Sequence, residues 1–143
     1  MTRDTARMAT STDREVCSLV NELSQTINRH VRRAAEKLDL TETQAVALRE
    51  LTEPTTLRAL AKRMCCEASN ITFVADRLEA MGLLERKPHP TDRRSKELHL
   101  TAKGTSIRRE LLKHLNADSP LQSLDQNAQG ELRDLLLRAT SHS

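Results

Sequence analysis

Apolar residues recur at three- and four-residue spacing along most of the chain, which is the periodicity of helices that bury one face. The first such stretch extends for about 25 residues from Asp13. Its apolar positions are Val16, Leu19, Val20, Leu23, Ile27, Val31, Ala34, Ala35 and Leu38. A helix of that length, about 37 Å at about 1.5 Å per residue, is longer than the small domain after it requires. We therefore expect its apolar stripe to contact a second chain.

Two shorter helices are predicted next. Residues 41–44 match a capping box, in which a threonine hydroxyl and a glutamine side chain satisfy free backbone N–H groups, and Pro54 ends the helix that starts there. The inward positions of this second helix are Ala45, Leu48 and Leu51. A third helix of two turns follows a short β-favouring link at residues 55–56, and its markers are Leu57, Leu60, Ala61 and Met64. Only residues 65–67 separate it from a fourth helix, which is the tight joint of a helix-turn-helix.

The fourth helix is predicted over residues 68–81, with Gly82 as a left-handed C-cap. At about 100° per residue, its apolar positions cluster on one side, which we assign to the core. These positions are Ile71, Val74, Ala75, Leu78 and Met81. Phe73, the only aromatic residue in the protein, lies on the opposite, mainly polar side. The pattern therefore predicts an exposed phenyl ring.

A β-hairpin and two more helices complete the pattern. Residues 83–86 and 97–100 fit the strands, and we place Pro88 and Pro90 in the loop between them because proline cannot donate a ladder hydrogen bond. Thr101 can N-cap a fifth helix, which residues 116–120 break, and residues 123–126 match a second capping box that opens a last helix. Apolar positions of these two helices are Ile107, Leu111, Leu112, Leu115, Leu132, Leu135 and Leu136.

Composition limits the classes of protein. Only 37% of the 143 residues are hydrophobic and 1% are aromatic, so a large self-sufficient core is not expected and oligomerisation would supply the missing burial. Cys17, Cys65 and Cys66 lack the number and spacing of a disulfide scaffold or a metal site, so no metal or other cofactor is expected. Residues 1–12 read as a polar tail or a loose first turn, and no apolar run approaches a membrane span. We therefore expect no membrane partner and a cytoplasmic location.

Positive charge is concentrated in residues 86–96. Five of these eleven residues are Lys or Arg and one is acidic, a local balance of +4 against +3 for the whole protein. The overall excess, 23 basic against 20 acidic residues, is too small for a general polyanion binder. A helix followed by a basic hairpin can place one element in a DNA groove and the other against the neighbouring backbone. No catalytic triad, Cys-His pair or carboxylate pair accompanies a pocket motif, so an enzyme is not expected.

Five segments, taken in order, carry a family resemblance: Leu57–Met64, Ser69–Thr72, Asp76–Arg86, Asp92–Lys96 and Leu100–Gly104. Together they resemble the multiple antibiotic resistance regulator (MarR) family of winged helix-turn-helix transcription factors. The resemblance implies a mainly α fold with a small β-wing. It places a winged helix-turn-helix DNA-binding domain at residues 41–103, between an N-terminal tail and dimerisation helix at 1–40 and C-terminal dimerisation helices at 104–143.

The resemblance also implies a function. It predicts a homodimer whose first, fifth and sixth helices interlock, and whose recognition helices and wings reach a pseudo-palindromic DNA operator with half-sites about 10 bp apart. The expected activity is transcriptional repression. A small, often anionic aromatic ligand, bound between the dimer helices and the winged domain, would release the operator by changing the spacing of the recognition helices.

Two groups of residues are then candidates for DNA contacts. In the fourth helix they are Ser69, Asn70, Thr72 and Phe73, since asparagine can pair with adenine, hydroxyls reach bases or phosphates, and a phenyl ring can meet a thymine methyl. In the wing they are Arg93, Arg94 and Lys96, one arginine entering a narrow minor groove. Arg77 is either a phosphate contact or a brace. The alternatives are a solvated helix face, with the phenyl ring folded back onto the domain, and a basic surface loop.

Three neighbouring positions are given structural roles. Asp92 would repel phosphate, and the resemblance assigns it to bond Arg94 or Arg77 and so fix the wing. Cys65 and Cys66 stand where the family commonly has glycine and an aliphatic residue. We expect Cys66 to be a small buried hydrophobe and Cys65 an exposed or cap residue.

Regulation has two candidate sites, and function has a rival of another class. Cys17 resembles, by position, the reactive cysteine of the peroxide-sensing branch of the family, and its alternative is a buried structural cysteine. Arg29, His30 and Arg33 lie in the part of the first helix suited to an anionic ligand, and they fit an exposed polar face equally well. The rival is a winged-helix module for protein–protein assembly, in which the wing binds an acidic protein.

Overall fold

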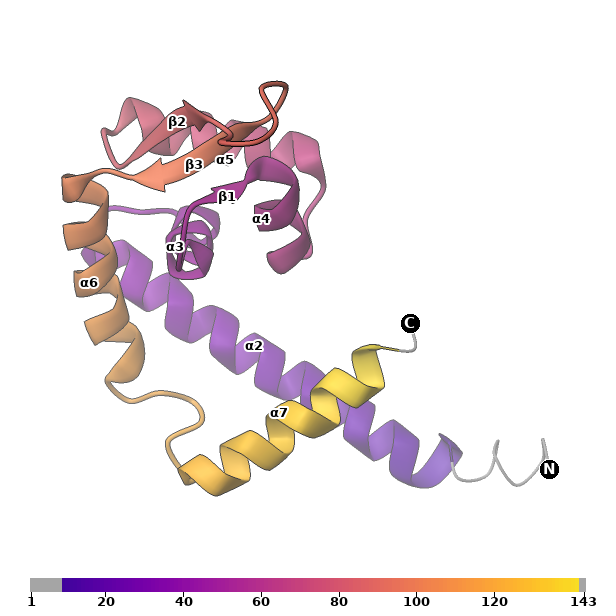
Figure 1. Cartoon of the computed structure of the whole chain (residues 1–143). Helices are drawn as coiled ribbons and strands as arrows, with labels where there is room; N and C mark the ends of the chain where they lie inside the picture. The colour runs from indigo at the N-terminus through magenta and orange to yellow at the C-terminus, as the bar shows by residue number, and fades with distance from the viewer. Residues whose placement is uncertain (1–8, 142–143) are drawn as a thin grey trace. The chain divides into compact units, whose positions relative to one another are not determined.

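The structure is a computed structural model that describes residues 9–141 (Figure 1). The first described element is a π-helical turn, η1 (Ala9–Asp13). Seven helices and strands follow, of which the last two form the β-hairpin, and two more helices come after the hairpin. The elements are α2 (Arg14–Lys37), α3 (Glu42–Glu50), β1 (Thr55–Thr56), α4 (Leu57–Arg63), α5 (Ala68–Ala80), β2 (Leu84–Pro88), β3 (Lys96–Leu100), α6 (Ala102–Asn116) and α7 (Gln126–Thr140). The predicted mainly α fold with a small β-wing is confirmed. Residues 1–8 of the predicted tail lie outside the described residues.

The chain divides into two units. One is Asn28–Ala117, and the other combines the N-terminal residues up to Ile27 with those from Asp118 onward. Every buried apolar side chain in the described chain lies in the first of these, between Val31 and Leu111. The predicted inward positions of α3 and α5 form its centre, and Leu48, Ile71 and Leu78 are fully buried. The helix-turn-helix and hairpin therefore share one core.

The second unit has no core of its own among the described residues. No residue of α7 is buried. Several large apolar side chains of this unit are instead exposed, namely Val16, Leu19 and Val20 of α2 and Leu135, Leu136 and Leu137 of α7. The predicted stripe of the first helix is thus buried only towards its C-terminal end, where Val31, Ala34 and Ala35 join the other unit's core.

Helix α7 begins later than the second capping-box match predicts. Its N-cap is Asp125, whose Oδ1 accepts a hydrogen bond from the N–H of Ala128 at 2.8 Å. Ser123 lies instead in a turn in which the N–H of Leu124 donates to the carbonyl of Leu121 at 3.0 Å. That turn keeps Leu124 out of helical conformation, so the carboxylate of Asp125, and not the hydroxyl of Ser123, supplies the cap.

A three-stranded antiparallel sheet has the order β1-β3-β2. Leu84 pairs with Leu100, and the β2–β3 ladder continues to Pro88 opposite Lys96. The sequence placed Pro88 in the loop, which is wrong. The N–H of the next residue, His89, donates to the Ser95 carbonyl at 3.1 Å, and backbone N–H directions alternate along a strand. The nitrogen of Pro88 therefore points to the open edge of β2, where no ladder bond is lost.

The hairpin joins α5 and α6 through a close backbone approach. Gly82, with φ of 76°, ends the α5 segment in the left-handed conformation that the sequence predicts. Thr101 then donates its hydroxyl to the Gly82 carbonyl at 2.6 Å and caps α6 by accepting from the N–H of Gly104 at 2.9 Å. A Cβ atom at Gly104 would overlap the carbonyl oxygen of Leu83. Only glycine lets α6 reach the base of the hairpin.

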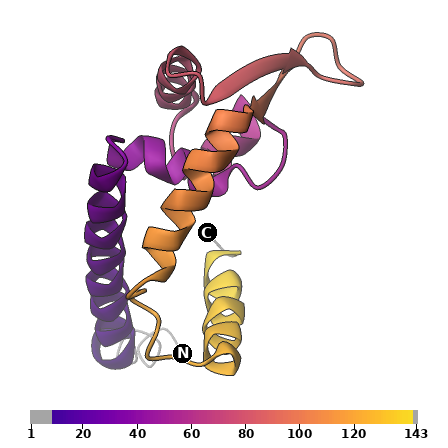
Figure 2. The same cartoon turned by 90° about the vertical axis from the view of Figure 1, so that its left-hand side faces the viewer.

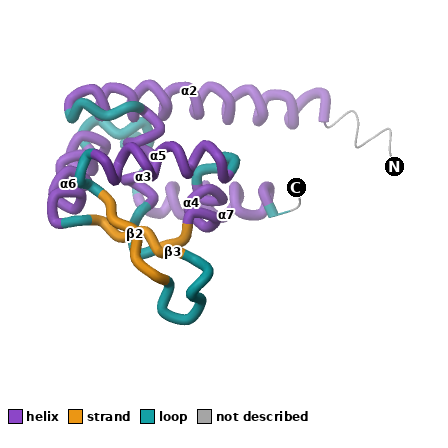
Figure 3. Tube along the Cα trace, turned by 90° about the horizontal axis from the view of Figure 1, so that it is seen from above, coloured by secondary structure: helices purple, strands orange, loops and turns teal. Residues whose placement is uncertain are grey.

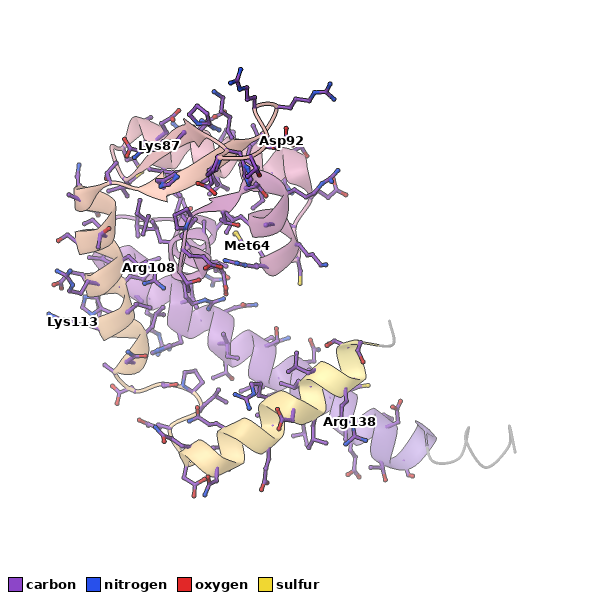
Figure 4. All side chains as sticks on the ribbon, viewed as in Figure 1. Met64, Lys87, Asp92, Arg108, Lys113 and Arg138 are labelled. Atoms are coloured by element: carbon purple, nitrogen blue, oxygen red, sulfur yellow. The ribbon has the colours of Figure 1, made fainter. Side chains whose placement is uncertain are left out.

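Two side chains that the sequence did not single out as structural connect the helices of this unit. Arg108 of α6 donates to the carbonyls of Leu48 at 2.8 Å and Arg49 at 3.0 Å, which satisfies acceptors at the C-terminus of α3 (Figure 4). Nε2 of His30 lies 2.7 Å from the carbonyl oxygen of Leu115, which connects α2 to the end of α6.

Within residues 9–141, no helix has both the length and the apolarity of a membrane span.

We predict that Gly104→Ala destabilises the protein by roughly 1–3 kcal/mol, because the added methyl meets rigid backbone, although alanine is the better helix former. Urea or thermal unfolding measures the change. Thr105→Ala, at an exposed position of the same helix, is the matched control and should shift stability by no more than a few tenths of a kcal/mol. Equal stability of the two variants would contradict the close contact.

Candidate nucleic-acid interface

The turn between α4 and α5 is a Schellman motif. The N–H of Cys66 donates to the carbonyl of Ala61 at 3.0 Å and that of Cys65 to Lys62 at 3.2 Å, while Cys65 has φ of 54°. This is the left-handed conformation that favours glycine, the residue that the family resemblance leads us to expect at this turn, and Cys65 adopts it. Cys65 is exposed as expected, but Cys66 is only half-buried and donates its thiol to the Met64 carbonyl at 3.4 Å. Its assignment as a buried hydrophobe is therefore wrong.

Helix α5 buries one side and presents the other to solvent. Ile71, Val74, Ala75 and Leu78 are in the core, and the fifth predicted core residue, Met81, is half-buried just beyond the helix. All the candidate base-contact residues are exposed, namely Ser69, Asn70, Thr72 and Phe73. Glu67 occupies the N-cap position but makes no side-chain capping hydrogen bond. The start of α5 thus has an exposed polar side, and the side chain of its N-cap residue makes no capping hydrogen bond.

Phe73 is 64% exposed, so its ring does not fold back onto the core. The guanidinium of Arg77 lies over it, 5.5 Å from the ring centroid, as expected for a cation and an aromatic ring one helical turn apart. Among the described residues Arg77 has no carboxylate partner. Its positive charge therefore remains available at the surface of the helix.

The two acidic residues of α5 are both paired with Arg86 of β2, whose single positive charge offsets one of their two negative charges. Its guanidinium lies 2.7 Å from Oδ1 of Asp76 and 2.8 Å from Oε1 of Glu79. Arg86 is the most buried partner of this group, with 21% of its side chain exposed. The sequence pattern groups Arg86 with the basic residues of 86–96 that would face a partner, and it does not predict that Arg86 pairs with the acids of α5. The available signal was the three-residue spacing of Asp76 and Glu79, which puts both carboxylates on one side of the helix.

Asp92 fixes the loop between β2 and β3, although not through an arginine side chain. Its Oδ1 accepts from the backbone N–H of Arg94 at 3.0 Å, and its Oδ2 accepts from the Ser95 hydroxyl at 3.3 Å. The expected bond to the guanidinium of Arg94 or Arg77 is absent from the described chain. The loop is short enough for the carboxylate to reach its own backbone first, as aspartate does in many turns.

Nδ1 of His89 supports the same loop from its other side. The backbone N–H groups of Thr91 and Asp92 both lie 3.2 Å from this nitrogen and donate to it. The loop projects beyond the helices of the Asn28–Ala117 unit in Figures 2 and 3. Its geometry is therefore set by side-chain bonds inside the loop.

The ion pairs leave a specific part of the basic stretch unpaired. Arg86 is used as above, and Lys87 lies 3.3 Å from Glu85. The three remaining basic residues are exposed and have no carboxylate partner in the part of the chain that the structure describes: Arg93, Arg94 and Lys96. Both views place α5 and this loop at the same end of their unit (Figures 1 and 2). The loop residues Arg93, Arg94 and Lys96 and the polar side of α5 therefore lie at the same end of this unit.

The other candidate sites lie elsewhere in the chain. Cys17 is exposed in α2 rather than buried in a core. His30 has its hydrogen bond to Leu115, while Arg29 and Arg33 are exposed. A groove of about 600 Å³ between α3 and α5 is lined in part by Gln44, Cys66, Asn70, Phe73 and Arg77, and by none of the predicted ligand residues. Residues 9–141 contain no cluster of three or more potential metal ligands.

These elements define a class of protein. Two short helices joined by a tight turn, the second with an exposed polar side, and a basic antiparallel hairpin behind it form a winged helix-turn-helix. A sequence model of the MarR family matches residues 40–96. The resemblance predicted from the sequence is therefore confirmed over residues 40–96.

Individual relatives agree with this assignment. The chain is 33% identical over 92 residues to the uncharacterized HTH-type transcriptional regulator YkoM of Bacillus subtilis (strain 168), a match that covers 63% of this chain and 60% of that protein. A MarR family regulator from Silicibacter pomeroyi has a similar fold, with a TM-score of 0.76, 23% identity and coverage of 87% and 86% of the two chains. A cysteine-to-serine mutant of MarR from E. coli, solved in complex with operator DNA, has a TM-score of 0.70, 24% identity and coverage of 87% and 93%. These relatives are transcriptional regulators and not enzymes.

We predict that Arg86→Gln lowers the free energy of unfolding by roughly 1 kcal/mol, since it removes two ion pairs and leaves two carboxylates close together. The deficit should shrink in about 1 M salt, where such charges are screened. Lys87→Gln removes the same charge from the same strand, where both members of the ion pair are at least half exposed, and should cost much less. A deficit equal to that of the control, or insensitive to salt, would contradict the bracing role.

Proposed function

We propose that this chain is a homodimeric, sequence-specific DNA-binding transcriptional regulator that represses from a pseudo-palindromic operator. The observation that carries the proposal is the separation of charge in the winged helix-turn-helix. Arg86 pairs with both carboxylates of α5, while Arg93, Arg94 and Lys96 have no carboxylate partner among residues 9–141. Phosphate attracts such charges, and the nearly uncharged start of α5 suits base edges. The operator complex of the E. coli relative supports the same use of the fold.

In the proposed complex α5 enters the major groove. Ser69, Asn70, Thr72 and Phe73 face the bases, where an amide can bond adenine and hydroxyls can bond bases or phosphates. Arg77, whose charge is not neutralised by a carboxylate in the described chain, contacts the backbone. The wing residues lie along the neighbouring groove and phosphates, with Asp92 holding the loop in shape.

The homodimer is supported by the second unit, whose described residues form no buried core. Helix α7 buries no residue, and the apolar residues of α2 up to Val20 are exposed. Exposed apolar stripes on two helices are costly in water, and an equivalent surface of a second chain would cover them. Two winged domains would then present two recognition helices about one turn of DNA apart. A regulator of this kind acts in the cytoplasm.

A small anionic or aromatic effector completes the proposal, with Arg29, His30 and Arg33 as its candidate contacts. Arg33 is exposed, and the His30 ring is held by the Leu115 carbonyl, so Arg33 is a better anchor for an anion than His30. Binding of the effector must favour a dimer whose recognition helices no longer match the operator, since a ligand shifts a conformational equilibrium only by its difference in affinity for the two states.

Enrichment of bound sequences from random DNA, followed by titration, tests the function. A repressor of this kind should prefer the enriched duplex over a shuffled one, bind it as two chains per duplex, and lose affinity steeply as salt rises. The rival, a protein–protein assembly module, predicts no sequence preference. Equal binding to enriched and shuffled DNA would therefore reject the proposal in favour of the rival.

We predict that Arg94→Ala weakens binding to the enriched duplex by about 1–3 kcal/mol at about 0.15 M salt. The backbone N–H that bonds Asp92 is retained in alanine, so the wing keeps its shape. Lys113→Ala, which removes an equal charge from exposed α6, is the matched control and should change affinity little because distant charges are screened. An unchanged affinity of Arg94→Ala would remove this residue from the interface.

The exposure of Cys17 favours a second candidate, a thiol-based sensor. A thiolate attacks an organic hydroperoxide to give a sulfenic acid and an alcohol. We predict that hydroperoxide then lowers operator affinity in the wild type and in Cys65→Ser and Cys66→Ser, but not in Cys17→Ser. Affinity that is unaltered in the wild type, or lost equally in Cys17→Ser, would remove Cys17 as the sensor.

A further inference from the structure

The exposed phenyl ring on α5 is an exception within its unit. Among the described residues, Phe73 is the one exposed large hydrophobic of Asn28–Ala117, since the others belong to the unit that lacks a core. At 64% exposure the ring gains little from the domain itself. Burial against a partner is what would make such a side chain favourable.

Arg77 gives the ring a defined position. Its guanidinium covers one face of Phe73 at 5.5 Å from the centroid, and an arginine one turn further along a helix leans back towards the preceding turn. An unstacked phenylalanine on a helix surface would sample several rotamers. The stack therefore orders the ring before any partner arrives, and it leaves the rest of the ring uncovered.

The neighbours of Phe73 limit the chemistry of its partner. Ser69, Asn70 and Thr72 are exposed polar groups on the same helix, so the surface as a whole suits hydrogen-bonding edges. A phenyl ring offers no hydrogen bond, and the apolar group on a base edge in the major groove is the C5-methyl of thymine. A ring that reached any other base edge would desolvate polar atoms without pairing them.

We propose that Phe73, ordered by Arg77, reads a pyrimidine 5-methyl group, so that each operator half-site contains a thymine opposite this ring. The inference rests on the proposed function, because it requires α5 in the major groove, and it adds which base one residue selects. Phe73 is then a specificity residue and Arg77 a positioning residue. Cytosine methylated at C5 would present the same methyl group at that position.

Replacing thymine by uracil, one position at a time, tests the proposal in a duplex enriched from random DNA. Uracil keeps every hydrogen-bonding group and removes only the methyl. Burial of one such group is worth about 0.8 kcal/mol, so one replacement should weaken wild-type binding about fourfold and the symmetric pair about fifteenfold. The sensitive position should be the same in both half-sites.

Variants assign the methyl contact to the ring. Phe73→Ala should bind the thymine and uracil duplexes equally, whereas Ser69→Ala, on the same exposed surface, should weaken binding to both and keep the fourfold ratio. Arg77→Gln should reduce the ratio as well as the affinity, because the ring is no longer ordered; a residue that only contacts phosphate would leave the ratio unchanged.

The outcomes separate this proposal from the function beneath it. Sequence-specific binding that is insensitive to uracil at every thymine overturns the methyl contact and leaves the regulator intact. A uracil effect that persists in Phe73→Ala assigns the methyl to another residue and also overturns it. Absence of any sequence preference rejects both proposals together.

Discussion

The close approach of α6 to the base of the hairpin is the constraint on which the rest of the winged domain depends. Gly104 has no room for a side chain beside the Leu83 carbonyl, and Thr101 bonds both the end of the α5 segment and the first turn of α6. Backbone contacts of this kind allow little adjustment, since neither partner can rotate away as a side chain would. The direction of the β2–β3 hairpin relative to α5 follows from them.

Charge is arranged on that framework by pairing as much as by composition. The chain carries almost as many acids as bases, so a uniform distribution would attract DNA weakly. Arg86 pairs with both carboxylates of α5 and offsets one of their two negative charges, and the Asp92 carboxylate accepts hydrogen bonds from its own loop. Arg77 and the three loop cations, Arg93, Arg94 and Lys96, have no carboxylate partner among the described residues. In the proposed complex, the attraction to phosphate is therefore local.

The two units differ in what they need from a partner. Asn28–Ala117 contains the buried core, so its folding does not require a ligand or DNA. The remainder has exposed apolar side chains and no buried residue in α7, and in the proposed dimer a second chain covers them. In the proposed dimer these requirements are linked, because the chains that complete one unit also set the distance between the two recognition helices. An effector that alters the helices would thereby act on DNA binding.

The sequence by itself determined the helices and the family, because helical periodicity, capping boxes and glycine at a left-handed cap are local patterns with local causes. Residues 41–44, Gly82 and the outward direction of Phe73 are examples, and each is confirmed. Local patterns were insufficient where several solutions competed, as with Ser123 and Asp125 for the cap of α7. The bonds of Asp92 within its own loop and the stack of Arg77 on Phe73 join residues two to four positions apart, so the sequence offered them among several alternatives. Only the tertiary structure decided which charges lack a partner and that Arg86, which belongs to another element, braces α5. The reason is physical: partners of long, flexible side chains depend on distances between elements, and no spacing along one chain specifies them.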